Sequence, residues 1–232
     1  MNVLKFSKIG VLIADTDEYD PLLSSLPFAE SIEAISSPFP KCGQASLKGT
    51  QVLFLCSGIG KVNAAAAAMY LILKGCDCLI NFGYSGGIAG VKRGDLVVND
   101  RFFEHDFDLT VLGYPLSQKP GEPPFYPADD TLLELFLQQH PQAVTGAAVT
   151  GDSFICDSKK RQKMKEEFHA VSCDMETAGI ASVCNRMRVP LLVFRKISDD
   201  AGEDASVGYR NTLKTDDSKP GEILAGLFGS LA

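Results

Sequence analysis

Short apolar runs that alternate with helical patterns are the feature that most restricts the fold of this chain. The run from Ile9 to Asp15 is continuously apolar, which is typical of a strand buried on both faces. Similar runs lie at residues 51–56, 78–82, 95–99, 143–149, 171–174 and 190–197. Helical patterns lie at residues 18–26, 61–74, 130–139, 158–167, 177–188 and within 218–231. This alternation predicts an α/β fold in which a mixed, mostly parallel twisted sheet carries helices on both faces.

The sequence also predicts how some of these elements are joined. Lys48-Gly49-Thr50 is typical of a hairpin turn between two antiparallel strands. Gly83 to Gly87 is expected to be the loop that leaves strand 78–82, and residues 102–128 have no clear period, which is typical of a long functional loop. No repeat, low-complexity segment or break in composition divides the chain, so residues 1–232 are expected to form a single domain.

Composition and charge exclude several classes of protein. The chain has 232 residues, of which 45% are hydrophobic, and this is enough for one large core. Its net charge of −7 argues against nucleic acid, because binding to phosphates depends on Lys and Arg. No apolar stretch approaches the roughly 18 residues of a membrane helix. The start of the chain lacks a signal-peptide cleavage site, and the seven cysteines lie mostly in apolar runs. We therefore expect a cytoplasmic protein with reduced, buried thiols.

One glycine pattern resembles two cofactor motifs but fails to match either in detail. Gly58-Ile-Gly60-Lys61 follows a strand and precedes an alanine-rich helix. A P-loop would have Ser or Thr after the lysine, where Val62 stands, and a dinucleotide fingerprint would have glycine in place of Asn63. The remaining interpretation is a tight turn whose backbone amides face the ligand crevice, so no nucleotide cofactor is expected.

Acidic residues follow three of the predicted strands, at the end of the sheet where α/β proteins bind ligands. Asp15-Thr-Asp-Glu18 follows the first strand, although acids there are also typical of helix capping. Glu176 follows strand 171–174, and Asp199 ends the run Arg195-Lys-Ile-Ser-Asp199. Carboxyl groups at such positions indicate acid–base chemistry on a small polar ligand.

The histidines give no comparable signal. Glu104-His105-Asp106 has a single imidazole among carboxylates, which is more typical of a solvated surface segment than of a metal site. His140 and His169 have no evident Ser or Cys partner, so a nucleophilic triad is not supported. No metal is expected.

Six motifs occur in the same order as in the nucleoside phosphorylase superfamily, and the chain most resembles its 5′-methylthioadenosine/S-adenosylhomocysteine nucleosidase branch. The resemblance spans residues 9–231 and is weakest at 20–45 and 205–231. The motifs are Ser57-Gly-Ile-Gly-Lys-Val62, Gly83-x-x-Gly-Gly87, Gly94-Asp-Leu-Val97, Thr150-Gly-Asp-Ser-Phe154, Asp174-Met-Glu-Thr-Ala178 and Arg195-x-Ile-Ser-Asp199.

The resemblance implies a role for each matching residue. Asp199 would donate a proton to N7 of the purine, and Glu18 would position and deprotonate the attacking water. Glu176 would hold the ribose hydroxyls, with Met175 beneath the sugar and Arg195 orienting Glu176. Phe154 would stack on the base and Ile155 would meet its edge, with Tyr209 near the sugar. The resemblance also places further residues in the substrate site, namely Ile59, Ser198, Tyr84 and Gly86.

The long loop is expected to serve a second protomer. Leu112, Tyr114 and Pro120 match residues that the family lends to the 5′-thio pocket of a neighbouring subunit, so the resemblance implies a homodimer. The chain departs from the family at two of the matched positions. Tyr84 stands where a small hydroxyl residue is usual, and Leu112 replaces an aromatic residue.

The expected activity is hydrolysis of the N-glycosidic bond of 5′-methylthioadenosine, S-adenosylhomocysteine or both. A phosphorylase would need cationic groups for phosphate, yet the first strand-to-helix turn is acidic and residues 81–90 contain no Arg or Lys. Three alternatives stay open: hydrolysis of another purine nucleoside such as futalosine, phosphorolysis, and a nucleoside-binding protein without catalysis. All three expected carboxylates are present, which argues against the last.

Overall fold

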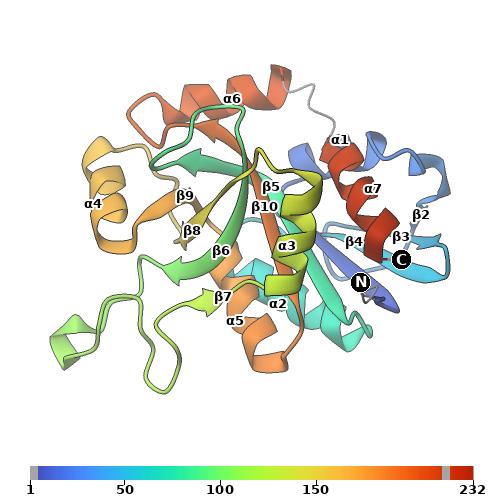
Figure 1. Cartoon of the computed structure of the whole chain (residues 1–232), viewed down its shortest axis with the longest axis horizontal. Helices are drawn as coiled ribbons and strands as arrows, with labels where there is room; N and C mark the ends of the chain where they lie inside the picture. The colour runs from blue at the N-terminus through green and yellow to red at the C-terminus, as the bar shows by residue number, and fades with distance from the viewer. Residues whose placement is uncertain (1–4, 216–219, 232) are drawn as a thin grey trace.

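The computed structural model, which describes residues 5–215 and 220–231, is built around one sheet of ten strands (Figure 1). Its strands are β1 (Lys8–Ile13), β2 (Glu33–Ala34), β3 (Lys41–Leu47), β4 (Thr50–Cys56), β5 (Cys78–Gly87), β6 (Leu96–Glu104), β7 (Tyr126–Pro127), β8 (Val144–Thr150), β9 (Ala170–Asp174) and β10 (Leu191–Asp199). Its helices are α1 (Thr16–Ser24), α2 (Lys61–Leu73), α3 (Asp130–Gln139), α4 (Ser158–Phe168), α5 (Thr177–Met187), α6 (Ala205–Thr215) and α7 (Pro220–Leu231), with short 3-10 turns η1 (Ala29–Ser31) and η2 (Thr110–Leu112).

The sheet closes on itself at one end and is open at the other. Hydrogen-bonded pairs connect β10, β6, β8, β9 and β5 in that order, and β5 pairs again with β10, so these five strands form a closed ring. From β5 the sheet continues through β1, β4, β3 and β2. Strand β1 is parallel to both β4 and β5, whereas β3 and β4 form the predicted antiparallel hairpin. The sheet is therefore mixed.

Helices cover both faces of this sheet, as the sequence predicted. Because side chains alternate along a strand, Ile9, Val11 and Ile13 of β1 point to one face and Leu12 points to the other. The first face packs against apolar residues of α1, α3 and α7, and the second packs against the alanine-rich helix α2 and against α5. The two layers lie on opposite sides of the open part of the sheet in Figure 1.

Most predicted elements are confirmed, but one expectation is wrong and one helix was not predicted. Residues 83–87 do not form a loop, because they continue β5: Gly83 to Gly86 pair with β10, and Gly86 and Gly87 pair with β9. Helix α6 was not predicted. The C-terminal helix is present as α7, although Ser218 and Lys219 of the predicted range lie outside the described residues.

The segment 102–128 is only partly a loop. Its first residues belong to β6, and it then contains η2 and β7 before α3 begins. Within residues 5–215 and 220–231, no helix combines the length and the apolar character that crossing a membrane requires. Six of the seven thiols are buried, and Cys156 is exposed.

Candidate active site

A cavity lies where β1, β5, β9 and β10 end. Asp15 follows β1, Gly86 is near the end of β5, Glu176 follows β9, and Asp199 ends β10. All the site residues predicted from the sequence, except Arg195, Leu112 and Tyr114, line this one cavity. They are Glu18, Ile59, Tyr84, Gly86, Phe154, Ile155, Met175, Glu176, Ser198, Asp199 and Tyr209. Residues from seven separate segments thus meet around one space.

Glu18 is a buried carboxylate in the first turn of α1. Asp15 caps this helix by accepting a hydrogen bond from the Asp17 N–H (3.2 Å), as the capping interpretation predicted, and the turn directs Glu18 toward β5. The Tyr84 N–H donates to Glu18 Oε1 at 3.3 Å. A Cβ atom at Gly83 would lie 2.8 Å from Glu18 Oε2, so glycine is required there for the carboxylate to approach the strand. Burial, and then the charge of Glu176, raise the pKa of Glu18 to about 8.

Glu176 is held by the backbone at the start of α2. The Gly60 N–H donates to Glu176 Oε1 at 2.9 Å, which confirms the prediction that an amide of the glycine turn faces the crevice. Both Gly58 and Gly60 have positive φ angles, which glycine adopts without strain. Burial and the nearby charge of Asp174 raise the pKa of Glu176 above its ordinary value, while the Gly60 hydrogen bond and Arg195 oppose the shift.

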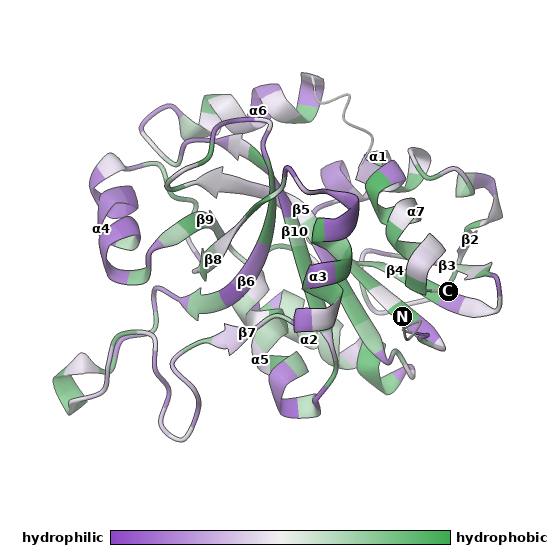
Figure 2. Cartoon of the chain, in the orientation of Figure 1, coloured by the Kyte–Doolittle hydropathy of each residue, from purple (hydrophilic) through white to green (hydrophobic). Residues whose placement is uncertain are grey.

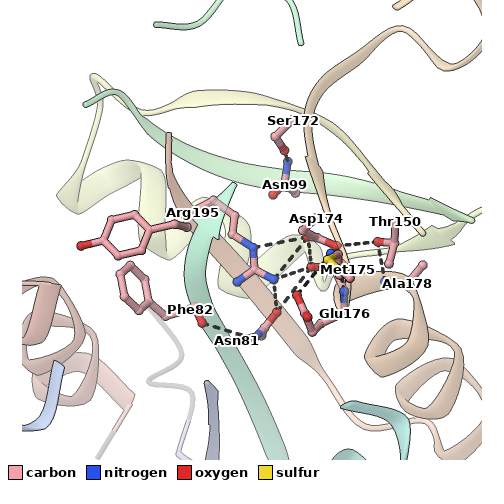
Figure 3. Close-up of polar contacts among 12 residues, drawn as sticks. Asn81, Phe82, Asn99, Thr150, Ser172, Asp174, Met175, Glu176, Ala178 and Arg195 are labelled. Atoms are coloured by element: carbon pink, nitrogen blue, oxygen red, sulfur yellow. Dashed lines mark hydrogen bonds and ion pairs between the residues drawn. The ribbon is translucent and has the colours of Figure 1, made fainter. Parts of the chain in front are cut away.

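Next to Glu176 lies a buried ion pair between Arg195 and Asp174 (Figure 3). Asp174 Oδ1 accepts from the Thr150 hydroxyl (2.7 Å) and from the Glu176 N–H (3.2 Å). The Arg195 guanidinium donates to Asp174, Asn81 and Thr177, and both charged side chains are almost fully buried. Charges buried in this way are stable only when they are paired and hydrogen-bonded.

The expectation that Arg195 orients Glu176 is therefore modified by the structure. The hydrogen bonds of its guanidinium go to residues next to Glu176. Arg195 acts on Glu176 and Glu18 through its charge, which lowers the pKa of both carboxyl groups against the effect of burial. Its Nη1 group is buried and has no hydrogen-bond partner among the described residues.

Asp199, the last residue of β10, also lines the cavity. The Ser198 hydroxyl donates to Asp199 Oδ2 at 2.6 Å, and the Ala201 N–H donates to Oδ1 at 2.9 Å. These hydrogen bonds favour the carboxylate, but burial outweighs them and raises the pKa of Asp199 above its ordinary value. Glycine at position 208 lets α6 approach, since a Cβ atom there would lie 3.0 Å from Asp199 Cβ.

Aromatic and apolar side chains form the rest of the cavity wall. Phe154 and Tyr209 meet edge to face, with ring centroids 5.9 Å apart. Ile155 is buried, whereas Phe154 and Ile59 are partly exposed at the mouth. Tyr84 also lines the cavity, and its ring packs against Phe82 with centroids 6.1 Å apart. A flat apolar ligand with a polar edge would suit such a site.

Some cavity residues were not predicted as site residues. They are Ala14, Asp15, Ser85, Ser153, Cys173 and Asp174. Most of them are close in sequence to predicted residues, and this proximity along the chain was the signal that could have found them. Leu112 and Tyr114 do not line the cavity of their own chain and are exposed in the segment between β6 and β7. In the described part of the chain, no three His, Cys, Asp or Glu side chains are arranged to hold a metal ion.

The sequence that forms this mixed sheet and its acidic cavity matches a known family. The model of the phosphorylase superfamily matches residues 8–225, and the chain belongs to this superfamily.

Its relatives include the nucleosidases that the sequence resembles. The 5′-methylthioadenosine/S-adenosylhomocysteine nucleosidase of Geobacillus sp. (strain WCH70) is 36% identical, over 97% of this chain and 99% of that protein. The aminodeoxyfutalosine nucleosidase of Campylobacter jejuni is 34% identical, over 87% of this chain and 90% of that protein. Among solved structures, the 5′-methylthioadenosine/S-adenosylhomocysteine nucleosidase of Neisseria meningitidis in complex with methylthio-immucillin-A has a TM-score of 0.88 and 31% identity, covering 97% of this chain and 100% of that one.

Proposed function

We propose that the protein hydrolyses the N-glycosidic bond of 5′-methylthioadenosine, S-adenosylhomocysteine or both, releasing adenine and the 5′-thio-ribose. The observation that carries the proposal is the meeting of Asp199, Glu18 and Glu176 in one cavity walled by aromatic and apolar side chains. Relatives named for this activity are similar over nearly their whole length. The enzyme is an N-glycosidic hydrolase that uses its own side chains for acid–base chemistry.

The proposed mechanism assigns the proton transfers to two carboxyl groups. Asp199, whose pKa is raised by burial, donates a proton to N7 of adenine while the C1′–N9 bond breaks. The electrons of that bond go to the base, and positive charge develops on the ribose as an oxocarbenium-like species. A water molecule forms the new C1′–O bond and gives its proton to Glu18. The developing positive charge favours the ionised form of Glu18, which burial otherwise disfavours.

The other cavity residues bind the substrate in this proposal. Glu176 accepts hydrogen bonds from the ribose hydroxyls, and Met175 packs against the sugar. Phe154 stacks on adenine beside Ile155, and Tyr209 lies near the sugar. Ile59, Tyr84, Gly86 and Ser198 complete the substrate-binding wall. Arg195 supports Glu176 and Glu18 through its positive charge.

Water is favoured over phosphate as the nucleophile by the charges of the cavity. No Lys or Arg is among the described residues that line it. Its lining instead has five acidic side chains, and those that are ionised would repel a phosphate dianion: Asp15, Glu18, Asp174, Glu176 and Asp199. Arg195 lies behind the wall and already pairs with Asp174.

A second candidate is hydrolysis of a related purine nucleoside. The C. jejuni relative named aminodeoxyfutalosine nucleosidase is nearly as similar to this chain as the relatives named for methylthioadenosine. The same carboxylates would serve either substrate, because the bond that breaks is the same. Differences would arise at the 5′ substituent and at Tyr84.

We further propose that the protein acts in the cytoplasm as a homodimer and that the chain is one domain. Val111, Leu112 and Tyr114 are exposed apolar residues in one projecting segment. In the proposed dimer, Leu112, Tyr114 and Pro120 of each protomer cover the 5′ end of the substrate in the other.

Free base released from four nucleosides tests the function. Methylthioadenosine, S-adenosylhomocysteine, aminodeoxyfutalosine and inosine would each be incubated with the protein, with and without phosphate, and the products separated by chromatography. We expect adenine from the first two without phosphate. Release that requires phosphate would instead show a phosphorylase, and release from aminodeoxyfutalosine alone would favour the second candidate.

The variant Asp199→Asn tests the mechanism. Loss of the acid is expected to lower kcat by about 10²–10⁴-fold while substrate still binds. The matched control is Asp200→Asn, which changes the exposed neighbouring carboxylate and should leave kcat unchanged. Turnover by Asp199→Asn at the wild-type rate would remove Asp199 from the mechanism.

A further inference from the structure

The first residue of α2, Lys61, joins three segments that are distant in sequence. Helix α2 begins after Gly60, which has no side chain to cap the first amides. Carboxylates from elsewhere accept these hydrogen bonds: Glu176 from the Gly60 N–H, and Asp152 from the Lys61 N–H at 2.8 Å. The start of α2 is thus fixed to the ribose side of the cavity and to the loop after β8.

The side chain of Lys61 completes a closed ring with Asp106 and Asp152. Lys61 Nζ donates to Asp106 Oδ1 at 2.5 Å and to Glu104 Oε2 at 3.1 Å. The other oxygen of Asp106 accepts from the Asp152 N–H at 3.0 Å. Asp152 is therefore held at both its main chain and its side chain, and both connections lead back to Lys61.

Asp152 is the residue before Ser153, Phe154 and Ile155, which line the cavity. The same segment is packed at Gly151, where a Cβ atom would collide with the ring of His105. Residues 104–106 thus form a support under the segment 151–155. The expectation that this Glu-His-Asp run is a solvated surface segment is wrong for Glu104, which is buried and pairs with both Lys61 and Lys119, whereas Asp106 is exposed as expected.

The burial of this cluster distinguishes it from an ordinary surface ion pair. The Lys61 and Glu104 side chains are 17% and 9% exposed, whereas those of the surface pair Lys163 and Glu167 are 68% and 37% exposed. Burial alone would favour a neutral amine, but the hydrogen bonds from Asp106 and Glu104 raise the pKa of Lys61 above its ordinary value. Lys61 therefore stays charged. Its loss would take the cation from Asp106, whose side chain is 34% exposed, while the buried Glu104 would keep Lys119.

We propose that Lys61 is a positioning residue for base recognition: through Asp106 and Asp152 it fixes the segment that carries Phe154 and Ile155. The inference rests on the proposed function, because it takes these two residues to contact adenine. Lys61 itself does not line the cavity. Its loss should weaken binding of the base while the carboxyl groups that perform the chemistry stay in place.

The test compares Lys61→Met with the control Lys119→Met. Each variant loses one lysine that pairs with Glu104, but Lys119 has no bond to Asp106 or Asp152 among the described contacts. We expect Lys61→Met to raise the dissociation constant of adenine and the KM of the nucleoside about tenfold, with kcat changed much less, since misplacement by a fraction of an ångström weakens contacts steeply. Lys119→Met should bind adenine as the wild type does, and Lys61→Arg should restore most of the affinity.

A second variant shows whether Lys61 acts through its contacts with Asp106 and Asp152. Asp106→Ala removes the same connection from its other side, so Lys61→Met and Asp106→Ala should each weaken adenine binding, and the double variant should be no worse than either. A purely structural role would lower the melting temperature without changing adenine affinity in the folded protein. Unchanged affinity in Lys61→Met, equal losses in Lys119→Met, or additive losses in the double variant would each overturn the proposal. If the wild type binds adenine but cleaves no nucleoside, the proposed function fails while the positioning role remains measurable.

Discussion

At the scale of single residues, the most informative side chain is Glu18, a carboxyl group whose burial is in conflict with its charge. Burial raises its pKa from 4.5 to about 8, so the folded protein holds a proton that the unfolded chain loses near pH 4.5. Below pH 4.5 both states are protonated. Between pH 4.5 and 8, Glu18 is protonated only in the folded state. Each rise in pH within this range therefore favours unfolding, until Glu18 also ionises in the folded protein.

We therefore predict that the melting temperature falls as the pH rises from 5 to 8 and levels above 8. Glu18→Gln, which carries no charge at any pH, should make this slope shallower and be the more stable protein at pH 8, with each kcal/mol appearing as about 2–4 °C. Thermal unfolding followed by circular dichroism across this range measures both. The rest of the slope comes from Glu176 and Asp199, whose pKa values burial also raises. The control Asp17→Asn changes an exposed acid in the same turn and should keep the wild-type slope. If the melting temperature of Glu18→Gln fell with pH as steeply as that of the wild type, the slope would belong to another group.

Between pH 5 and 8, activity should change with pH in the opposite direction to the melting temperature. Glu18 accepts a proton from water only when it is ionised, so turnover should rise toward pH 8 while stability falls. The site is thus less stable than the same fold would be with an amide at position 18. A structure that keeps a costly carboxyl group at this position is consistent with selection for chemistry over stability.

At the scale of elements, local patterns in the sequence predicted most helices and strands because each has its own period. The turn before α2 was predicted from its glycines, and the range predicted for α3 matches the observed one. The predicted end of β5 was wrong. Residues Gly83 to Gly87 are stabilised as a strand because they pair with β9 and β10, which are distant in sequence. Pairing of this kind overrides the weak strand preference of glycine and leaves no local signal.

The candidate site shows the same division between local and distant information. Glu18, Glu176 and Asp199 were predicted because each follows a strand, and family resemblance supplied their proposed roles. The connection of Lys61 to Asp106 and Asp152 was not predicted, since its partners lie 45 and 91 residues away along the chain. Individually, each of these charged residues is compatible with a solvated surface.

The contact between α2 and α5 gives a prediction at this scale. Ala178 and Ala181 of α5 are buried, and a Cβ atom at Gly179 would lie 2.7 Å from the Lys61 carbonyl oxygen. Gly179→Ala should therefore destabilise the protein by about 1–3 kcal/mol, although alanine is the better helix former. Gly229→Ala, in α7 with no atom within 4 Å of the added Cβ, should be stabilising by up to about 1 kcal/mol. Denaturant unfolding of both variants measures the difference, and equal effects would contradict close packing as the cause.

At the scale of the whole molecule, the segment between β6 and β7 projects from the sheet and has an apolar end (Figure 2). Val111 is 90% exposed and Leu112 is 67% exposed, and neither contributes to the core. Phe154 and Ile59 are also exposed, at the mouth of the cavity. Exposed apolar groups at two places that a second protomer could bring together favour an assembly in which each chain completes the other's site.

This assembly predicts that the wild-type protein sediments at twice the mass of one chain and that Leu112→Asp shifts it toward the monomer. A carboxylate buried against apolar side chains costs several kcal/mol, so the dimer should weaken by about two orders of magnitude or more. The KM for the nucleoside should rise with it, because the 5′ end loses its cover. Leu73→Asp is the control: Leu73 is 75% exposed but ends α2 at the far side from its glycine turn, and this variant should remain dimeric. Sedimentation velocity and initial rates on the same samples would decide the matter. A wild-type monomer with full activity, or a Leu112→Asp dimer with an unchanged KM, would show that each cavity is complete within its own chain.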